Sequence, residues 1–272
     1  MAHLQQRTAA WHNARRGKLT ASNLGAALGL VSYVSRNTAY RRCMGLDKFE
    51  GNVATEWGTN NEANGIADYQ TLTGNIVVAT GLHTHRLYQW LAGSPDGFVG
   101  SEGMIEVKCP FYYRKDGGRL HKEVPMHYLL QMNALMSICE RKWCDYVCWE
   151  PNGMVVYRVT YDPTLFDFLL TFYGQFYASM QANADEPSSL SVAERDEIKK
   201  VIAHSMKQTV NYEFWTRPPT MPPPSSDPFI DEDPEAPDRK KRKRVSGVQG
   251  EEEEVGNTAT TTDSEMAIEA AV

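Results

Sequence analysis

The chain has 272 residues and a formal net charge of −6, and 42% of its residues are hydrophobic. This length and composition predict one large domain, or one domain with a tail, built around a substantial core. The sequence has neither an apolar run of about 18 residues nor an apolar leader, which argues against a membrane span and predicts an intracellular protein.

The excess acidic charge is confined to the C-terminal part of the chain. Residues 1–216 hold 21 basic and 21 acidic residues, whereas residues 217–272 hold 7 basic and 13 acidic residues. A neutral body still binds DNA when its positive charges gather in one groove. The overall charge therefore does not exclude a nucleic-acid partner.

The predicted elements alternate between helices and strands. Thr20 and Ser22 indicate the start of a helix, because hydroxyl side chains accept hydrogen bonds from its first free N–H groups. A long helix over residues 56–73 is expected to place Ala63, Ile66, Ala67 and Leu72 on its inner face. Further elements are strands at 75–80, 88–92 and 104–109, an amphipathic helix at 128–138, a hairpin at 143–150 and 155–161, and a helix at 165–182.

This order of elements predicts a mixed α/β fold in which helices flank a central sheet. Residues 1–183 are expected to form the main domain, and residues 184–216 a C-terminal helical extension. Residues 217–272 are rich in proline, acidic residues and serine, and are expected to be a disordered tail. The tail carries an unbroken basic block at 239–244, a pattern typical of a nuclear localisation signal or a nucleic-acid patch.

Two neighbouring segments carry the strongest chemical pattern. Asp96 follows a Ser-Pro turn, and about ten residues later Glu106 and Lys108 stand two apart on a predicted strand. Side chains two apart on a strand share one face, and a hairpin would bring Asp96 beside Glu106. Val107 then points into the core and offers its carbonyl oxygen to the site.

This residue set suits a metal-dependent reaction. Two adjacent carboxylates repel each other unless a cation neutralises them, and oxygen ligands with an open coordination shell suit Mg²⁺, with Mn²⁺ as a substitute. Such an ion lowers the pKa of bound water and neutralises charge on a phosphodiester. Asp96, Glu106 and Lys108 therefore predict phosphodiester hydrolysis, although a surface hairpin with a Glu–Lys pair would show the same spacing.

Four sequence blocks occur in a fixed order between residues 10 and about 180. They are WHNARRGKLTAS (11–22), WGTNNEA (57–63), SPDG (94–97) with EVKCPF (106–111), and YLLQ (128–131). Together they resemble the lambda-exonuclease-like (YqaJ-type) viral recombinase nucleases of the PD-(D/E)xK superfamily. The resemblance implies a restriction-endonuclease-like fold, with a mixed central sheet flanked by helices.

The resemblance also implies roles for the matching positions. Lys108 resembles the catalytic lysine, and Gln131, close to Tyr128, resembles the glutamine that helps to place the nucleophile. Metal ligation is implied for four positions, with the main-chain carbonyl acting at the third: Asp96, Glu106, Val107 and Glu62.

Further positions resemble sites of DNA contact. Arg15, Ser22 and Ser94 resemble the pocket for a terminal 5′-phosphate; a helix N-terminus at Ser22 would favour an anion, and Arg15 offers bidentate phosphate binding. Tyr128 is interpreted as either a DNA contact or a core residue. A glycine-containing loop after the catalytic strand suits either DNA-backbone contact or a solvated surface, through Arg114, Lys115 and Arg119.

The cysteine pattern leaves one alternative chemistry. Five cysteines without a secretion signal argue against a disulfide framework. Cys139, Cys144 and Cys148 raise an iron–sulfur or zinc site, but they form no close Cys-x-x-Cys pair. Buried free thiols are therefore the prediction.

By resemblance, the protein digests one strand of linear double-stranded DNA from the 5′ end and leaves a 3′ overhang for recombination or viral DNA processing. A homo-oligomer, a trimer in many members, and a single-strand annealing protein as partner are also implied. The block at 239–244 predicts a nuclear import receptor and the nucleus of a eukaryotic host cell. A structure-selective or nicking endonuclease on the same fold and a non-catalytic DNA-binding relative are the alternatives.

Overall fold

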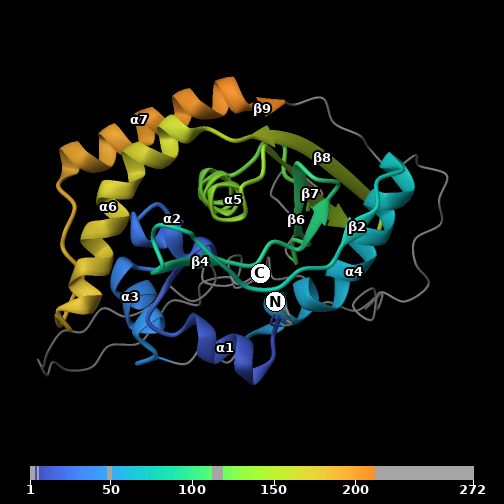
Figure 1. The fold of residues 1–272 in the computed structure, drawn as a ribbon. Coiled ribbons are helices and arrows are strands. Elements are labelled where there is room, and N and C mark those ends of the chain that lie inside the picture. The colour runs from blue at the N-terminus through green and yellow to red at the C-terminus, as the bar shows by residue number, and fades with distance from the viewer. Residues whose placement is uncertain (1–3, 5, 48–50, 112–118, 212–272) are drawn as a thin grey trace, which may run out of the picture.

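A computed structural model describes residues 4, 6–47, 51–111 and 119–211 (Figure 1). Arg114 and Lys115 of the predicted basic loop lie outside the described residues, as does the tail at 217–272. None of the helices within these ranges combines the length and the apolar character that a membrane crossing needs.

The main sheet has six strands in the order β2–β5–β6–β7–β8–β9. Strands β6 and β7 run parallel, and the other neighbours run antiparallel. A second sheet of three strands has the order β1–β4–β3. The strands are β1 (Leu19–Thr20), β2 (Val77–Val78), β3 (His83–Thr84), β4 (Leu91–Gly93), β5 (Gly97–Val99), β6 (Gly103–Lys108), β7 (Trp143–Glu150), β8 (Gly153–Thr160) and β9 (Val210–Asn211).

Helices lie against both faces of the main sheet. They are α1 (Ala9–Arg15), the 3₁₀ turn η1 (Ala21–Asn23), α2 (Leu24–Ala27), α3 (Arg36–Met44), α4 (Val53–Thr73), α5 (Met126–Cys139), α6 (Pro163–Gln181) and α7 (Val192–Thr209). Helix α4 packs on the face that carries Val107 and Trp149, and α5 packs on the opposite face (Figure 1). The predicted mixed sheet flanked by helices is confirmed.

Helix α5 differs from the amphipathic helix that the sequence predicts. Ten of its 14 residues are buried, because α2, α6, α7 and strands β7 and β8 enclose it. A helix enclosed on all sides is expected to be apolar all round, and polar residues inside it need partners. Asn133 exchanges hydrogen bonds with the main chain of Asp162, and Gln131 donates to Glu106.

The inner face of α4 agrees with the prediction in part, because Ile66 and Leu72 pack against the core. Ala63 and Ala67 are exposed, whereas Gly65 faces the sheet. A Cβ at Gly65 would lie 2.8 Å from Cγ1 of Val107, so the absence of a side chain lets α4 approach β6 closely. This close approach holds Glu62, one turn earlier, within electrostatic range of the carboxylates at β6.

The helical extension shares the core of the preceding domain. Ile198 and Ile202 of α7 are fully buried together with residues of α5 and α6. Strand β9 pairs with β8 and extends the main sheet. Residues 192–211 therefore add a helix and an edge strand to the same folded unit.

The cysteines are free thiols, and four of the five are buried, as predicted. Burial raises the pKa of Cys43 to about 11. A thiol with a raised pKa stays protonated at neutral pH and is a poor nucleophile. The cysteines therefore serve packing in this fold.

Candidate active site

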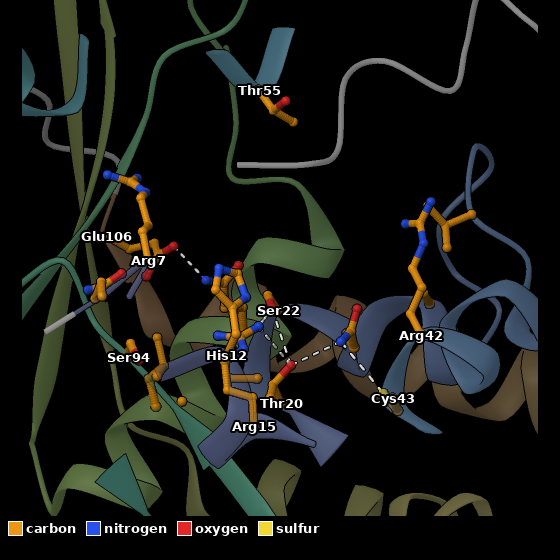
Figure 2. Close-up of a pocket in the computed structure, with 18 of the residues that line it drawn as sticks. Arg7, His12, Arg15, Thr20, Ser22, Arg42, Cys43, Thr55, Ser94 and Glu106 are labelled. Atoms are coloured by element: carbon orange, nitrogen blue, oxygen red, sulfur yellow. Dashed lines mark hydrogen bonds between the residues drawn. The ribbon is translucent and has the colours of Figure 1, made fainter. Parts of the chain in front are cut away.

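The predicted chemical residues meet in one cleft of about 740 Å³. Its lining comes from α1, η1, α4, the turn before β5, β6 and α5. Figure 2 shows Glu106 on one side of the cleft and Arg42 on the other, with Arg15 between them. The fold thus brings together segments that lie more than a hundred residues apart in the chain.

The β5–β6 hairpin brings Asp96 beside β6, as the spacing predicts. Gly97 pairs with Ile105, and the Asp96 carboxylate accepts a hydrogen bond from the Val107 N–H at 2.7 Å. Glu106 and Lys108 share the face that meets α5, and both are buried. Their side chains form an ion pair with 2.9 Å between Nζ and Oε1.

Glu106 is held on one oxygen atom and lacks a partner on the other. Its Oε1 accepts hydrogen bonds from Lys108 and from the Gln131 amide, the latter at 2.5 Å, whereas its buried Oε2 has no hydrogen-bond partner. Burial raises the pKa of Glu106. Burial and the charge of Glu106 likewise raise the pKa of Asp96 well above its usual range.

The donor set fits a divalent cation. Two repelling carboxylates, one with an unsatisfied buried oxygen, are the arrangement that a hard cation stabilises. In the described part of the chain, however, no three His, Cys, Asp or Glu side chains converge as a ligand group. Glu62 lines the same cleft, but its carboxylate forms an ion pair with Arg7.

Lys108 remains a charged ammonium inside this centre. Burial acts to lower its pKa, but the nearby Glu106 and Asp96 carboxylates outweigh burial and raise it. The ammonium also lies 4.9 Å from the centre of the Tyr128 ring, and Tyr128 packs against His127 at 4.1 Å. Lys108 is therefore a fixed cation and hydrogen-bond donor.

A second polar group surrounds Arg15. Its guanidinium lies over the Trp11 ring at 4.0 Å and contacts the hydroxyls of Thr20 at 3.3 Å and Ser22 at 3.5 Å. Among the described residues no carboxylate pairs with it, and burial lowers its pKa to about 10. A partly buried cation without a counter-ion and with long hydrogen bonds is suited to bind an anion.

Hydroxyl groups complete this pocket. Ser94 Oγ accepts a hydrogen bond from the Trp11 indole at 2.9 Å, which leaves its own hydrogen free for another acceptor. The predicted helix at Ser22 is a 3₁₀ turn followed by the four-residue helix α2. The expectation that a helix dipole at Ser22 favours an anion is therefore wrong, because so short a helix has little dipole.

Arg119 is not part of the cleft. It is 7% exposed and lies 4.9 Å from the centre of the Trp57 ring. Its main-chain N–H also donates to Glu150 at 3.2 Å. The structure places Arg119 in the interior, whereas the sequence suggests either contact with the DNA backbone or a solvated surface.

Three lining residues were missed by the sequence reasoning. Trp11 stands four residues before Arg15, a spacing that puts both side chains on one helical face and was available as a signal. Thr20 was interpreted as a helix start, yet its hydroxyl contacts Arg15. Arg7 reaches Glu62 across 55 residues, and no local pattern indicates this contact.

Comparisons with known proteins agree with this architecture. The model of the YqaJ-like viral recombinase domain matches residues 10–142. An alkaline exonuclease from Laribacter hongkongensis, LHK-Exo, has 27% sequence identity and a TM-score of 0.54, over 72% of this chain and 99% of that chain. The structure of LHK-Exo in complex with dAMP gives 25% identity, the same TM-score and the same coverage. No curated protein matches the chain.

The matched residues contain both polar groups of the cleft. The Arg15 pocket and the centre formed by Asp96, Glu106 and Lys108 fall within residues 10–142. The likeness to the solved exonuclease reaches beyond these residues, because it covers 72% of this chain. Residues 10–142 are therefore similar to a YqaJ-like viral recombinase domain, and the chain as a whole is similar to a solved alkaline exonuclease.

Proposed function

We propose that the protein is a divalent-metal-dependent exonuclease that degrades one strand of linear double-stranded DNA from its 5′ end. The family match and the alkaline exonuclease structures support the broader statement: the protein is a deoxyribonuclease that acts on double-stranded DNA. One observation carries the finer proposal. The cleft that holds the buried carboxylates and Lys108 also holds the Arg15 pocket, which suits a phosphate group.

Asp96, Glu106 and the Val107 carbonyl would hold Mg²⁺, or Mn²⁺ in its place. The ion would supply the Lewis acidity that activates water and neutralises charge on the phosphodiester. The unsatisfied Oε2 of Glu106 supports this assignment, because an unpaired oxygen in the interior is otherwise costly.

The protein's own side chains position the reacting groups. The Lys108 ammonium is fixed beside Glu106, where it can donate to a phosphate oxygen on which negative charge develops. Gln131 fixes Glu106 through its amide N–H, and its amide oxygen is then able to orient the attacking water. Together they hold the carboxylate, the water and the phosphate in one geometry.

The Arg15 pocket accounts for the proposed polarity. Hydrolysis of the P–O3′ bond releases a 5′-mononucleotide and leaves a new 5′-phosphate on the remaining strand. The pocket around Arg15 and Ser94 can bind each new end in turn, so digestion proceeds in the 5′-to-3′ direction and leaves a 3′ overhang. LHK-Exo binds dAMP, a nucleotide of the class expected as product.

The test uses linear duplexes with 5′-phosphate or 5′-hydroxyl ends, a covalently closed circle, and Mg²⁺. We expect mononucleotides from the 5′-phosphorylated duplex, an intact circle, and no product with Lys108→Ala. Cutting of the circle would assign an endonuclease instead. Absence of Lys108-dependent cleavage with either Mg²⁺ or Mn²⁺ would leave a DNA-binding protein without catalysis.

The proposal extends to assembly and location. If the protein is a trimer, light scattering should measure a mass three times the chain mass of 30.6 kDa. A single-strand annealing protein would bind the 3′ overhang that the nuclease exposes. The basic block at 239–244 would bind a nuclear import receptor. A reporter fused to residues 217–272 should then accumulate in the nucleus of a eukaryotic cell, and a reporter that stays outside would contradict this location.

A further inference from the structure

Arg7 lies at the carboxylate centre, although it belongs to none of the motifs. Its guanidinium forms an ion pair with Glu62, and the two side chains are 46% and 17% exposed. Figure 2 shows Arg7 on the same side of the cleft as Glu106. Both members of the pair line the same cleft as Asp96 and Lys108.

The segment that carries Arg7 is docked at several points. Its Gln6 amide donates to the carbonyl of Pro95, directly before Asp96, at 3.1 Å. The main chain of Leu4 passes so close to Gly81 that any side chain there would collide with it. Arg7 itself has φ of 66°, a left-handed conformation that residues other than glycine rarely adopt. Such a backbone persists where surrounding contacts impose it, often at functional sites.

The charge balance of the centre explains why a cation is needed at Glu62. Glu62 acts on both other carboxylates, because its charge raises the pKa values of Asp96 and Glu106. Lys108 alone opposes these three negative charges from within the β6 strand. The Arg7 guanidinium supplies a second positive charge beside Glu62.

We propose that Arg7 takes the place of a second divalent cation at Glu62, so that the site binds one Mg²⁺ or Mn²⁺ tightly, through Asp96 and Glu106. This inference rests on the proposed metal-dependent function. A fixed positive charge within a few ångströms repels an incoming divalent ion, and its removal should tighten that weaker site at least about tenfold. Arg7 is then a positioning residue that sets how many metal ions the cleft holds.

The experiment counts bound Mn²⁺ without DNA, by electron paramagnetic resonance of the free ion and by calorimetry, on the full chain. The wild type should show one tight site. Arg7→Ala should show a second site that is at least about tenfold tighter than any weak second site of the wild type. Arg7→Lys, which keeps the charge, should behave as the wild type. Arg86→Ala provides the matched control, because Arg86 also faces a glutamate but is 81% exposed.

A double variant separates the proposed effect from misfolding. Arg7→Ala combined with Glu62→Gln removes the carboxylate that would bind the second ion, so it should return to one Mn²⁺. Thermal unfolding of each metal-free variant shows that the compared chains are folded.

Three results would overturn the inference. The first is two tight Mn²⁺ sites in the wild type, and the second is an unchanged number of bound Mn²⁺ ions in Arg7→Ala. The third is the same unchanged number together with weakened DNA binding, which would make Arg7 a DNA contact. Failure of every variant to bind Mn²⁺ would also overturn the metal-dependent function, which distinguishes the two proposals.

Discussion

Replacing Arg15 by methionine should separate recognition of the DNA end from folding. Burial lowers the pKa of Arg15 from 12.5 to about 10, and each pKa unit corresponds to about 1.4 kcal/mol, so burying the charge costs about 3.5 kcal/mol at most. Partial exposure and the two hydroxyl contacts reduce this cost to about 1 kcal/mol. Methionine keeps an apolar stem over Trp11, so the free energy of unfolding without DNA should stay unchanged or rise by about 1 kcal/mol.

Binding of the DNA end should respond in the opposite direction. A hydrogen bond to a charged group contributes about 1.5–3 kcal/mol, so kcat/KM for a 5′-phosphorylated duplex should fall about 10- to 100-fold in Arg15→Met. The value for a 5′-hydroxyl duplex should change little. Arg86→Met, at an exposed position outside the cleft lining, controls for net charge and should leave the ratio of the two substrates unchanged. A less stable Arg15→Met protein that keeps its preference for 5′-phosphate would refute the reasoning and make Arg15 a structural residue.

Three further predictions concern the centre and its supports. In EDTA, the thermal stability should fall as pH rises above 3.8 through the raised pKa of Asp96, because the folded state binds more protons than the unfolded state in this range. Addition of Mg²⁺ or the substitution Asp96→Asn should flatten this dependence on pH. A stability that rises with pH would contradict the assignment. Gly65→Ala should lower the free energy of unfolding by denaturant by about 1–3 kcal/mol and lower kcat, because the added methyl group pushes α4 away from β6. Gly174→Ala is the control, because Gly174 has open space around it and the substitution should be neutral or stabilising. Tyr69→Phe removes a buried hydrogen bond from the Tyr69 hydroxyl to Asp145 of β7, so the free energy of unfolding should fall by about 1–2 kcal/mol while kcat is unchanged. A large loss of kcat would instead assign this hydrogen bond a part in catalysis.

Local patterns predicted the elements whose environment is simple. The hairpin of β7 and β8 was recognisable because two apolar runs flank Pro151 and Asn152 at a tight turn. The environment of α5 was not predicted, because enclosure by three other helices is a tertiary property. Periodicity predicted Ile66 and Leu72 on the inner face of α4, but the close approach at Gly65 was missed. That approach depends on the absence of a side chain, whereas hydrophobic periodicity registers only side chains that are present.

The same distinction holds within the candidate site. The two-residue period of a strand was enough to place Glu106 and Lys108 on one face and Val107 on the other. The family resemblance pointed to Gln131, which the structure brings to Glu106. No rule of spacing predicts the pairing of Arg7 with Glu62, because a segment before the first helix can reach any part of the surface.

The two polar groups of the cleft have opposite electrostatic deficits. The centre at Asp96 and Glu106 has an excess of negative charge that Lys108 reduces, whereas no acidic residue in the described part of the chain pairs with Arg15. Under the proposed function, a metal ion would relieve the first deficit and a DNA phosphate the second. A ligand that binds only the folded state lowers its free energy, so the metal ion and the DNA end should each raise the thermal stability of the protein. A cleft that is electrostatically incomplete at both ends is therefore best completed by a metal ion and a phosphorylated DNA end bound together.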